Sequence, residues 1–227
     1  MVKASLSRGL FFYMERVTFY IDGFNFYYAL KRSKKSNPVW KQYYWIDFIK
    51  LFSQFLGENQ VLEKVVYFTA TPLSPQKSSR QGTLFNANKL LNGNRFEVVR
   101  GKYYDKQFIC PSCQFSISKP EEKRTDVNIS VRMMGDCSLN ATDVLVLVSA
   151  DSDLVPPIEF IQKHHRNKTI RVYFPPNAFC NDLNHNMLQN KKKAIKLSNN
   201  IGKFANSVMP DTITNGIKTV TIPEKWK

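Results

Sequence analysis

The fold is decided by the stretch VLVLVSADSDL at residues 144–154. Its first five residues are aliphatic without interruption, which is typical of a central parallel strand covered by helices on both faces. Two aspartates, Asp151 and Asp153, follow this strand closely. Because ligands of parallel α/β sheets bind beyond the carboxyl ends of the strands, we expect a polar site at this point.

A second strand with an acidic end is predicted near the start of the chain. Residues 17–21 (VTFYI) are β-branched or aromatic and stop at Asp22 and Gly23, and apolar residues then recur at helical spacing over 24–30. The pattern predicts a strand, a turn and a helix. Further strands are expected at 61–70, 96–100, 169–174 and near 195–197, and helices at 46–56, 76–91, 121–134 and 154–163, with one more in the remainder.

Alternating strands and helices predict a three-layer α/β/α domain with a mainly parallel central sheet. We expect this domain at residues 15–198, between an N-terminal tail at 1–14 and a C-terminal tail at 199–227. An irregular, cysteine-containing insertion is expected at 102–120. No stretch approaches the roughly 18 apolar residues of a membrane helix, so no membrane partner is expected.

The charge balance favours an acidic partner. The 33 Lys and Arg residues against 18 Asp and Glu residues give a formal net charge of +15. Such a surface attracts polyanions, so nucleic acid is the leading candidate and a merely soluble basic surface is the alternative. The four cysteines include only one close pair and do not form a disulfide framework, which predicts a reducing, cytoplasmic environment.

Four carboxylates from distant parts of the sequence can converge at the sheet edge: Asp22, Asp126, Asp151 and Asp153. Carboxylates are the ligands that Mg²⁺ and Mn²⁺ prefer, and these cations activate water and neutralise a scissile phosphate. Taken singly, Asp22 is also explained as a turn residue, and Ser152 or Asp153 as a helix cap. Their joint placement predicts phosphodiester hydrolysis.

Three blocks of sequence resemble the NYN domains, the LabA-like branch of the PIN-like nuclease superfamily. The blocks are YIDGFNFYY at 20–28, EKRTDVNISV at 122–131 and LVSADSDLVPPI at 147–158. Their order and spacing match the signature blocks of the family. The resemblance implies a PIN-like fold and a metal-dependent ribonuclease that uses Mg²⁺ or Mn²⁺.

The resemblance also implies roles for individual residues. Asp22, Asp126 and Asp151 are the expected metal ligands. Asp153 is expected to act on the metal through water, and Asn25 to position substrate or water. These five residues form the predicted catalytic site.

RNA, in single-stranded form, is the expected substrate. Lys123 and Arg124 adjoin Asp126 and are expected to hold phosphates without reading sequence, while Ser149 and Ser152 are expected to hydrogen-bond a carboxylate or phosphate. Four tyrosines could stack on unpaired bases, with core packing as the alternative for at least half of them: Tyr27, Tyr28, Tyr103 and Tyr104.

Arg132 departs from the family pattern, because many relatives carry an acidic residue six positions after the aspartate of the second block. A positive charge there would replace a metal or abolish its binding. Asp136, one helical turn later, either compensates or is an exposed polar residue. The principal alternative function is therefore an RNA- or protein-binding module that has lost activity. A phosphatase with Asp22 as nucleophile is a further alternative, although a second aspartate two residues on is missing.

Cys110 and Cys113 have the spacing of a zinc knuckle, but one such pair supplies only two of the four ligands of a structural zinc. Two reduced thiols are the default expectation. The alternative is a zinc site completed by Cys137, Cys180 or a partner subunit in a homo-oligomer.

Overall fold

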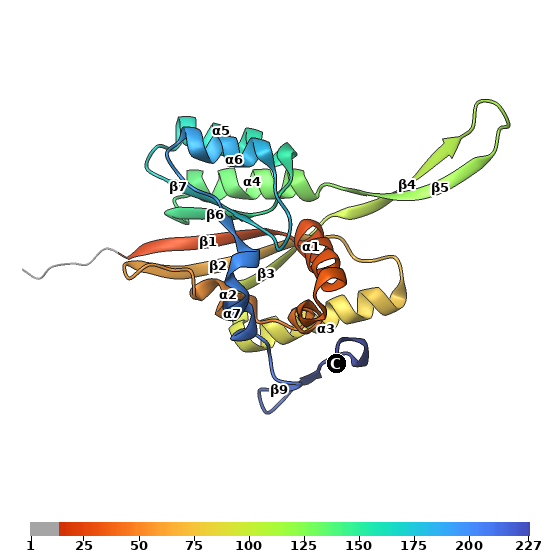
Figure 1. Cartoon of the computed structure of the whole chain (residues 1–227), viewed down its shortest axis with the longest axis horizontal. Coiled ribbons are helices and arrows are strands. Elements are labelled where there is room, and N and C mark those ends of the chain that lie inside the picture. The colour runs from red at the N-terminus through yellow and green to blue at the C-terminus, as the bar shows by residue number, and fades with distance from the viewer. Residues whose placement is uncertain (1–13) are drawn as a thin grey trace, which may run out of the picture.

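The computed structural model describes residues 14–227, apart from the side chains at 105, 106 and 117–119. The N-terminal tail expected at 1–14 lies outside this range except for its last residue. A central sheet of six strands has the order β3-β2-β1-β6-β7-β8, and every pairing in it is parallel (Figure 1). The strands are β1 (Glu15–Asp22), β2 (Gln60–Thr69), β3 (Phe96–Arg100), β6 (Val144–Val148), β7 (Thr169–Phe174) and β8 (Ile195–Lys196).

Helices cover both faces of this sheet, so the predicted three-layer α/β/α fold is confirmed (Figure 1). One layer contains α1 (Gly23–Ser36), α2 (Phe48–Ser53), α3 (Pro75–Asn92) and α7 (Ile201–Ala205). The other layer contains α4 (Thr125–Ser138), α5 (Val155–His164) and α6 (Asn181–Gln189). No helix of the described residues is long and apolar enough to cross a membrane.

Burial on both faces explains the uninterrupted aliphatic sequence of β6. Val146 packs into the core on the α1 side of the sheet, and its neighbours Leu145 and Leu147 pack on the α4 side. All five residues of the strand are buried. Each such side chain stabilises the fold by about 1.5–3 kcal/mol relative to an exposed one. Polar residues at alternate positions would therefore be costly here.

The expectation of an irregular insertion at 102–120 is wrong. Strands β4 (Lys102–Ile109) and β5 (Ser116–Lys123) form an antiparallel hairpin that projects from the domain (Figure 1). The helix expected to begin near Glu121 begins at Thr125 instead, because residues 121–123 are still paired within β5. The strands pair only with each other in their two-stranded sheet, so no core imposes apolar alternation on their sequence.

The expectation of a C-terminal tail at 199–227 is also wrong. After α7, strands β9 (Thr212–Thr214) and β10 (Thr219–Thr221) form a small hairpin. Met209 and Ile213 are buried in a cluster with Trp45, whose indole N–H donates a hydrogen bond to the carbonyl of Pro210 at 2.9 Å. This segment is therefore part of the folded domain.

Candidate metal centre and adjoining cleft

The order of strands reverses between β1 and β6. From β1 the chain adds β2 and β3 on one side, and from β6 it adds β7 and β8 on the other. In open α/β sheets, ligands bind at such a switch point, beyond the carboxyl ends of the strands. Asp22 is the last residue of β1, and Asp151 follows the end of β6 at Val148. The topology therefore brings these two carboxylates to the expected ligand site.

Asp22 is held in place by the sharp passage from β1 into α1. One of its carboxylate oxygens accepts the backbone N–H of Asn25 at 3.0 Å, which caps the helix, and the other accepts the Ser149 hydroxyl at 2.8 Å. At Gly23, a Cβ would lie 2.3 Å from a ring carbon of Tyr67 and 2.5 Å from the carbonyl oxygen of Phe68. Only glycine fits this position, which explains the Asp-Gly pair.

Three carboxylates meet at this edge of the sheet. Single oxygen atoms of Asp22, Asp126 and Asp151 all lie within 4.8 Å of one another. Asp126 comes from the first turn of α4, and Asp151 caps the short 3₁₀ helix η3 (Ser152–Leu154). Asp22 is buried, and the other two are half-buried. Within the part of the chain that the structure describes, none of the three forms an ion pair with a cationic side chain.

The electrostatics of the three carboxylates reflect this crowding. Burial raises the pKa of Asp22, although hydrogen bonds from Asn25 and Ser149 partly oppose the rise. Burial also raises the pKa of Asp126 to about 6, and the negative charges of Asp22 and Asp151 contribute further to the shift. A divalent cation would offset the cost of burying these carboxylates and would reduce the repulsion between them. The donor set fits Mg²⁺ or Mn²⁺.

Glu122 is an acidic neighbour that the sequence analysis missed. Its carboxylate accepts hydrogen bonds from the backbone N–H of Thr125, at 3.2 Å, and from the Thr125 hydroxyl. Its charge also contributes to the raised pKa of Asp126. The signal was present in the sequence as a glutamate three residues before the threonine that starts α4.

The structure separates the other predicted polar residues into two sets. Asn25 and Ser149 contact Asp22 directly, as described above. Ser152 and Asp153 are exposed on η3 and do not belong to the three-carboxylate group. The capping role expected of one of these two falls to Asp151, whose carboxylate accepts the backbone N–H of Asp153 at 3.1 Å.

The two predicted phosphate-binding residues have protein partners. Lys123 lies 3.0 Å from a carboxylate oxygen of Glu121. Arg124 has a left-handed backbone, with φ of 81°, and its guanidinium lies 5.6 Å from the ring centre of Tyr104. Lys123 is the last residue of β5, and Arg124 connects β5 to α4, two residues before Asp126.

Arg132 does not enter the carboxylate group. Its guanidinium bonds Glu97 at 2.8 Å and Asp136 at 2.9 Å, and the Tyr20 hydroxyl donates to Asp136 at 2.8 Å. Six residues along α4 separate it from Asp126 by about 9 Å. Arg132 therefore does not take the place of a metal among the three carboxylates. Asp136 neither joins those carboxylates nor is exposed, because it is buried against Arg132.

A cleft of about 340 Å³ is lined by Gly23, which directly follows Asp22, and by Tyr67 among others, whereas the three carboxylates themselves are not part of its lining. The negative charge of Asp22 contributes to the raised pKa of Tyr67, after the larger effect of burial. Much of the lining is aromatic and includes Tyr27, Tyr28, Tyr44, Tyr103 and Trp226. Lys31, Lys77 and Arg80 add positive charge.

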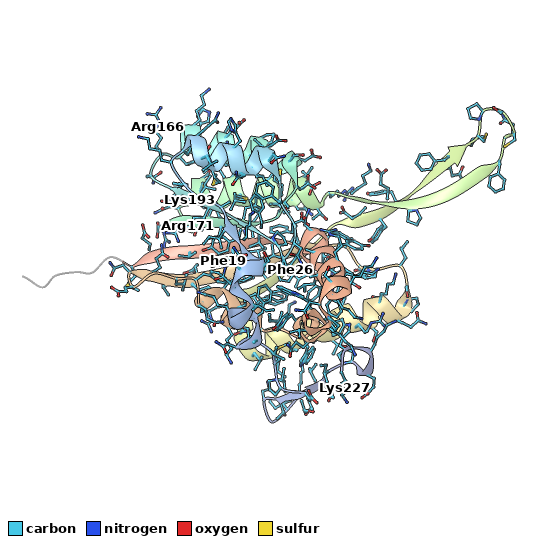
Figure 2. The ribbon with its side chains drawn as sticks, viewed as in Figure 1. Phe19, Phe26, Arg166, Arg171, Lys193 and Lys227 are labelled. Atoms are coloured by element: carbon cyan, nitrogen blue, oxygen red, sulfur yellow. The ribbon has the colours of Figure 1, made fainter. Side chains whose placement is uncertain are left out.

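Three of the four tyrosines proposed for base stacking therefore line this cleft, and Tyr104 does not. Core packing of at least half of the four is contradicted. Tyr27, Tyr28 and Tyr104 are exposed by 39%, 47% and 44%, and Tyr103 is half-buried. Other basic residues lie elsewhere: Arg166, Arg171 and Lys193 lie on the side of the molecule away from the hairpin (Figure 2).

The cysteine pair lies apart from this site. Cys110 and Cys113 are free thiols in the turn between β4 and β5. Among the described side chains, Asp22, Asp126 and Asp151 form the only group of three or more His, Cys, Asp or Glu residues that could hold a metal. Cys137 and Cys180 therefore do not complete a zinc site with the pair within one chain.

Comparison with known proteins gives a family, a curated relative and a related structure. The sequence model of the NYN domain matches residues 16–188. The chain is 26% identical to 6-hydroxy-3-succinoylpyridine 3-monooxygenase HspA of Pseudomonas putida (strain DSM 28022 / S16), across 93% of this chain and 75% of the relative. A crystal structure of a protein of unknown function from Vibrio parahaemolyticus RIMD 2210633 has a TM-score of 0.50 at 21% identity, covering 75% of this chain and 88% of the other. This last likeness concerns the fold alone.

Proposed function

The chain belongs to the NYN domain family, and on this basis we propose that it is a metal-dependent ribonuclease that hydrolyses phosphodiester bonds in RNA. The observation that carries the proposal is the group formed by Asp22, Asp126 and Asp151, which has no cationic side chain paired to it among the described residues. A protein that places three carboxylates together without a counter-charge is suited to an external cation.

Asp22, Asp126 and Asp151 would hold Mg²⁺ or Mn²⁺. When bound, the cation would neutralise charge on the scissile phosphate and lower the pKa of an attacking water. Ser149 and Asn25 fix the orientation of the Asp22 carboxylate, since each donates to a different oxygen. Such hydrogen bonds to a ligating carboxylate tune metal affinity.

The exposed residues around the metal ligands are proposed to position the substrate. Asp153 and Ser152 lie on η3, where they can reach ordered water or a phosphate oxygen. Lys123 and Arg124 are proposed to exchange Glu121 and Tyr104 for phosphates when RNA binds. Contacts of this kind hold the backbone without reading sequence.

Single-stranded RNA is the proposed substrate because the cleft suits an unpaired base. Exposed rings such as Tyr27 and Tyr28 offer stacking surfaces, and each stacked base contributes about 1–3 kcal/mol in known single-strand complexes. Lys31, Lys77 and Arg80 supply positive charge for the flanking phosphates. Bases within a duplex are not available for such stacking.

A second candidate is supported by the curated relative and by the same cleft. The relative is named as a monooxygenase of a substituted pyridine, and the alignment covers 93% of this chain. The aromatic lining of the cleft would suit a small heteroaromatic ring as well as a base. Monooxygenation would place one atom of O₂ on the ring and release the other as water, and it would consume two electrons from a reduced donor and two protons from solvent.

A cleavage assay separates these functions. Labelled single-stranded RNA is incubated with metal-stripped protein and Mn²⁺ or Mg²⁺, beside Asp22→Asn, Asp151→Asn and the control Glu97→Gln. Wild type and control should cut the RNA, EDTA should stop the reaction, and both aspartate variants should be inactive. Cleavage that persists in both variants would contradict the mechanism.

Two other outcomes would replace the proposal. Metal-independent RNA binding without cleavage would identify a binding module. Consumption of O₂ and an electron donor with a hydroxypyridine, in the absence of RNA cleavage, would favour the second candidate.

A further inference from the structure

The tip of the β4–β5 hairpin holds two cysteines in a closed turn. The backbone N–H of Cys110 donates to the carbonyl of Phe115 at 2.9 Å, and the N–H of Gln114 donates back to the Cys110 carbonyl at 2.9 Å. Gln114 adopts a left-handed conformation with φ of 56°. These bonds close the chain into a compact loop around Cys113.

The neighbours of Cys110 in the turn favour its thiolate form. The backbone N–H groups of Cys113 and Ser112, together with the Cys113 thiol, lower the pKa of Cys110. Donors placed in this way stabilise a thiolate, which is the form of cysteine that binds metals. Cys110 and Cys113 lie three residues apart on one tight turn, which is the spacing of one half of a zinc site.

The pair is only half of a metal site. Structural zinc takes four ligands in a tetrahedral arrangement, and the loop supplies two. No other described His, Cys, Asp or Glu side chain gathers with the pair into a group of three. Cys137 is buried in α4, and Cys180 precedes α6. Since the described residues supply no third ligand, a four-ligand site on this pair would take its other two ligands from a second molecule.

Among the described elements, no helix or strand other than β4 and β5 lies beside the hairpin tip. The hairpin extends away from the helices and the sheet, and the side chains near its tip have no other element beside them (Figures 1 and 2). Ile109 and Phe115, which flank the cysteines, are exposed by 57% and 64%. A two-stranded hairpin alone is marginally stable in water, so a contact at the tip would stabilise it.

We propose that the hairpin tips of two copies of this chain meet around one zinc ion, to which each copy contributes Cys110 and Cys113. Two identical pairs complete a four-thiolate site in a two-fold arrangement, without a ligand of any other kind. Binding releases the thiol protons to solvent as the sulfurs become thiolates. The same symmetry brings Ile109 and Phe115 of one copy against their counterparts on the other.

The proposed junction leaves the carboxylate site free. Each hairpin strand of eight residues spans about 27 Å, so the two domains would be joined at a distance from their clefts. The zinc site therefore does not depend on whether the protein cleaves RNA.

Zinc content and molecular mass test the proposal together. The full chain is purified under reducing conditions with zinc, and metal analysis is combined with light scattering after size exclusion. We expect one zinc ion per two chains and a mass about twice 26.3 kDa, returning to the monomer mass with a strong chelator. Cobalt in place of zinc should give the absorption of a tetrahedral four-thiolate site.

Variants at the tip give the matched comparison. Cys110→Ser and Cys113→Ser should lose both zinc and dimer, whereas Cys180→Ser should keep both. Circular dichroism should show all three folded, since the hairpin turn lies outside the hydrophobic core. One zinc per monomer, a zinc-free monomer, or a dimer that survives chelation would each overturn the proposal.

Discussion

Helix α4 carries acidic side chains into two environments that differ in their counter-charges. At its N-terminus, Asp126 meets Asp22 and Asp151, and none of the three has an ion-pair partner among the described residues. Further along, Asp136 and the nearby Glu97 share the guanidinium of Arg132. The same helix thus borders one uncompensated carboxylate group and one compensated group.

The pKa values follow this difference. Burial, reinforced by neighbouring carboxylates, raises the pKa of Asp126 to about 6. Hydrogen bonds from Arg132 lower the pKa of Glu97, despite partial burial. The charges of Arg132, Glu97 and Asp136 are satisfied by one another. We therefore explain this group by its contribution to the stability of the folded chain. The uncompensated group costs stability in the metal-free protein, which is typical of a functional site.

The largest difference between the two groups is expected in RNA cleavage, when one carboxylate of each group is replaced by an amide. Asp126→Asn removes a proposed metal ligand and should lower RNA cleavage at least about 100-fold. Glu97→Gln removes a carboxylate of similar size from the compensated group and should stay within about 2-fold of wild type. Initial cleavage rates at saturating Mn²⁺ measure the activity of both variants. Equal losses of activity would contradict the functional difference between the two groups.

Removing the shared cation should affect stability instead. Arg132→Met removes the guanidinium that Glu97 and Asp136 share, although Glu97 keeps its ion pair with Lys64 at 3.2 Å. The free energy of unfolding should fall by about 1–2 kcal/mol, allowing for partial exposure of these side chains. Arg166→Met, at an exposed position, is the control and should change little. Urea unfolding measures both variants. A large loss of cleavage by folded Arg132→Met would contradict the view that the Arg132 group contributes to stability and not to activity.

The pH dependence of stability should have opposite signs in the two groups. Because the pKa of Asp126 is raised from 3.8 to about 6, its contribution in metal-free protein is full below pH 3.8 and is lost as pH rises through 6. The lowered pKa of Glu97 gives a contribution that is present above its unfolded value of 4.5 and lost on acidification below it.

Unfolding in EDTA between pH 4 and 7 tests this difference. Asp126→Asn should gain about 1–2 kcal/mol over wild type across that range, once solvent screening is allowed for. In saturating Mn²⁺, the free energy of unfolding of wild type should instead rise with pH, since metal binding requires the ionised carboxylates. A parallel pH profile for the two proteins would contradict the raised pKa.

The smallest change in stability is expected from Tyr20, whose hydroxyl donates to Asp136 in the compensated group. Tyr20→Phe removes a buried hydrogen bond to Asp136, which keeps its bond to Arg132. The free energy of unfolding should fall by about 1 kcal/mol. A loss larger than that of Arg132→Met would mean that the hydroxyl, not the guanidinium, stabilises this group.

Much of the domain was predictable because its strands are buried on both faces. The aliphatic run of β6 and the aromatic run of β1 could be identified from sequence, and the strand-end rule placed Asp22 and Asp151 at one edge of the sheet. Asp126 was harder to place, since its position depends on where α4 begins. The resemblance to NYN domains supplied that position.

The remaining errors have a common physical origin. The strands of the β4–β5 hairpin pair with each other, so burial leaves no periodic trace in their sequence. The C-terminal segment is anchored by a few scattered residues such as Met209 and Ile213, which no periodicity reveals. Arg132 was misjudged because its partner Glu97 lies on β3, far away in sequence, and only the fold shows that they meet.

Calorimetric titration of the metal-stripped protein with Mn²⁺ tests most directly whether the uncompensated carboxylates form a metal site. Wild type and Glu97→Gln should bind Mn²⁺ with similar affinity, and Asp126→Asn should bind at least about 10-fold more weakly. An affinity that is unchanged in Asp126→Asn, or that falls equally in Glu97→Gln, would contradict the assignment of the cation to Asp22, Asp126 and Asp151.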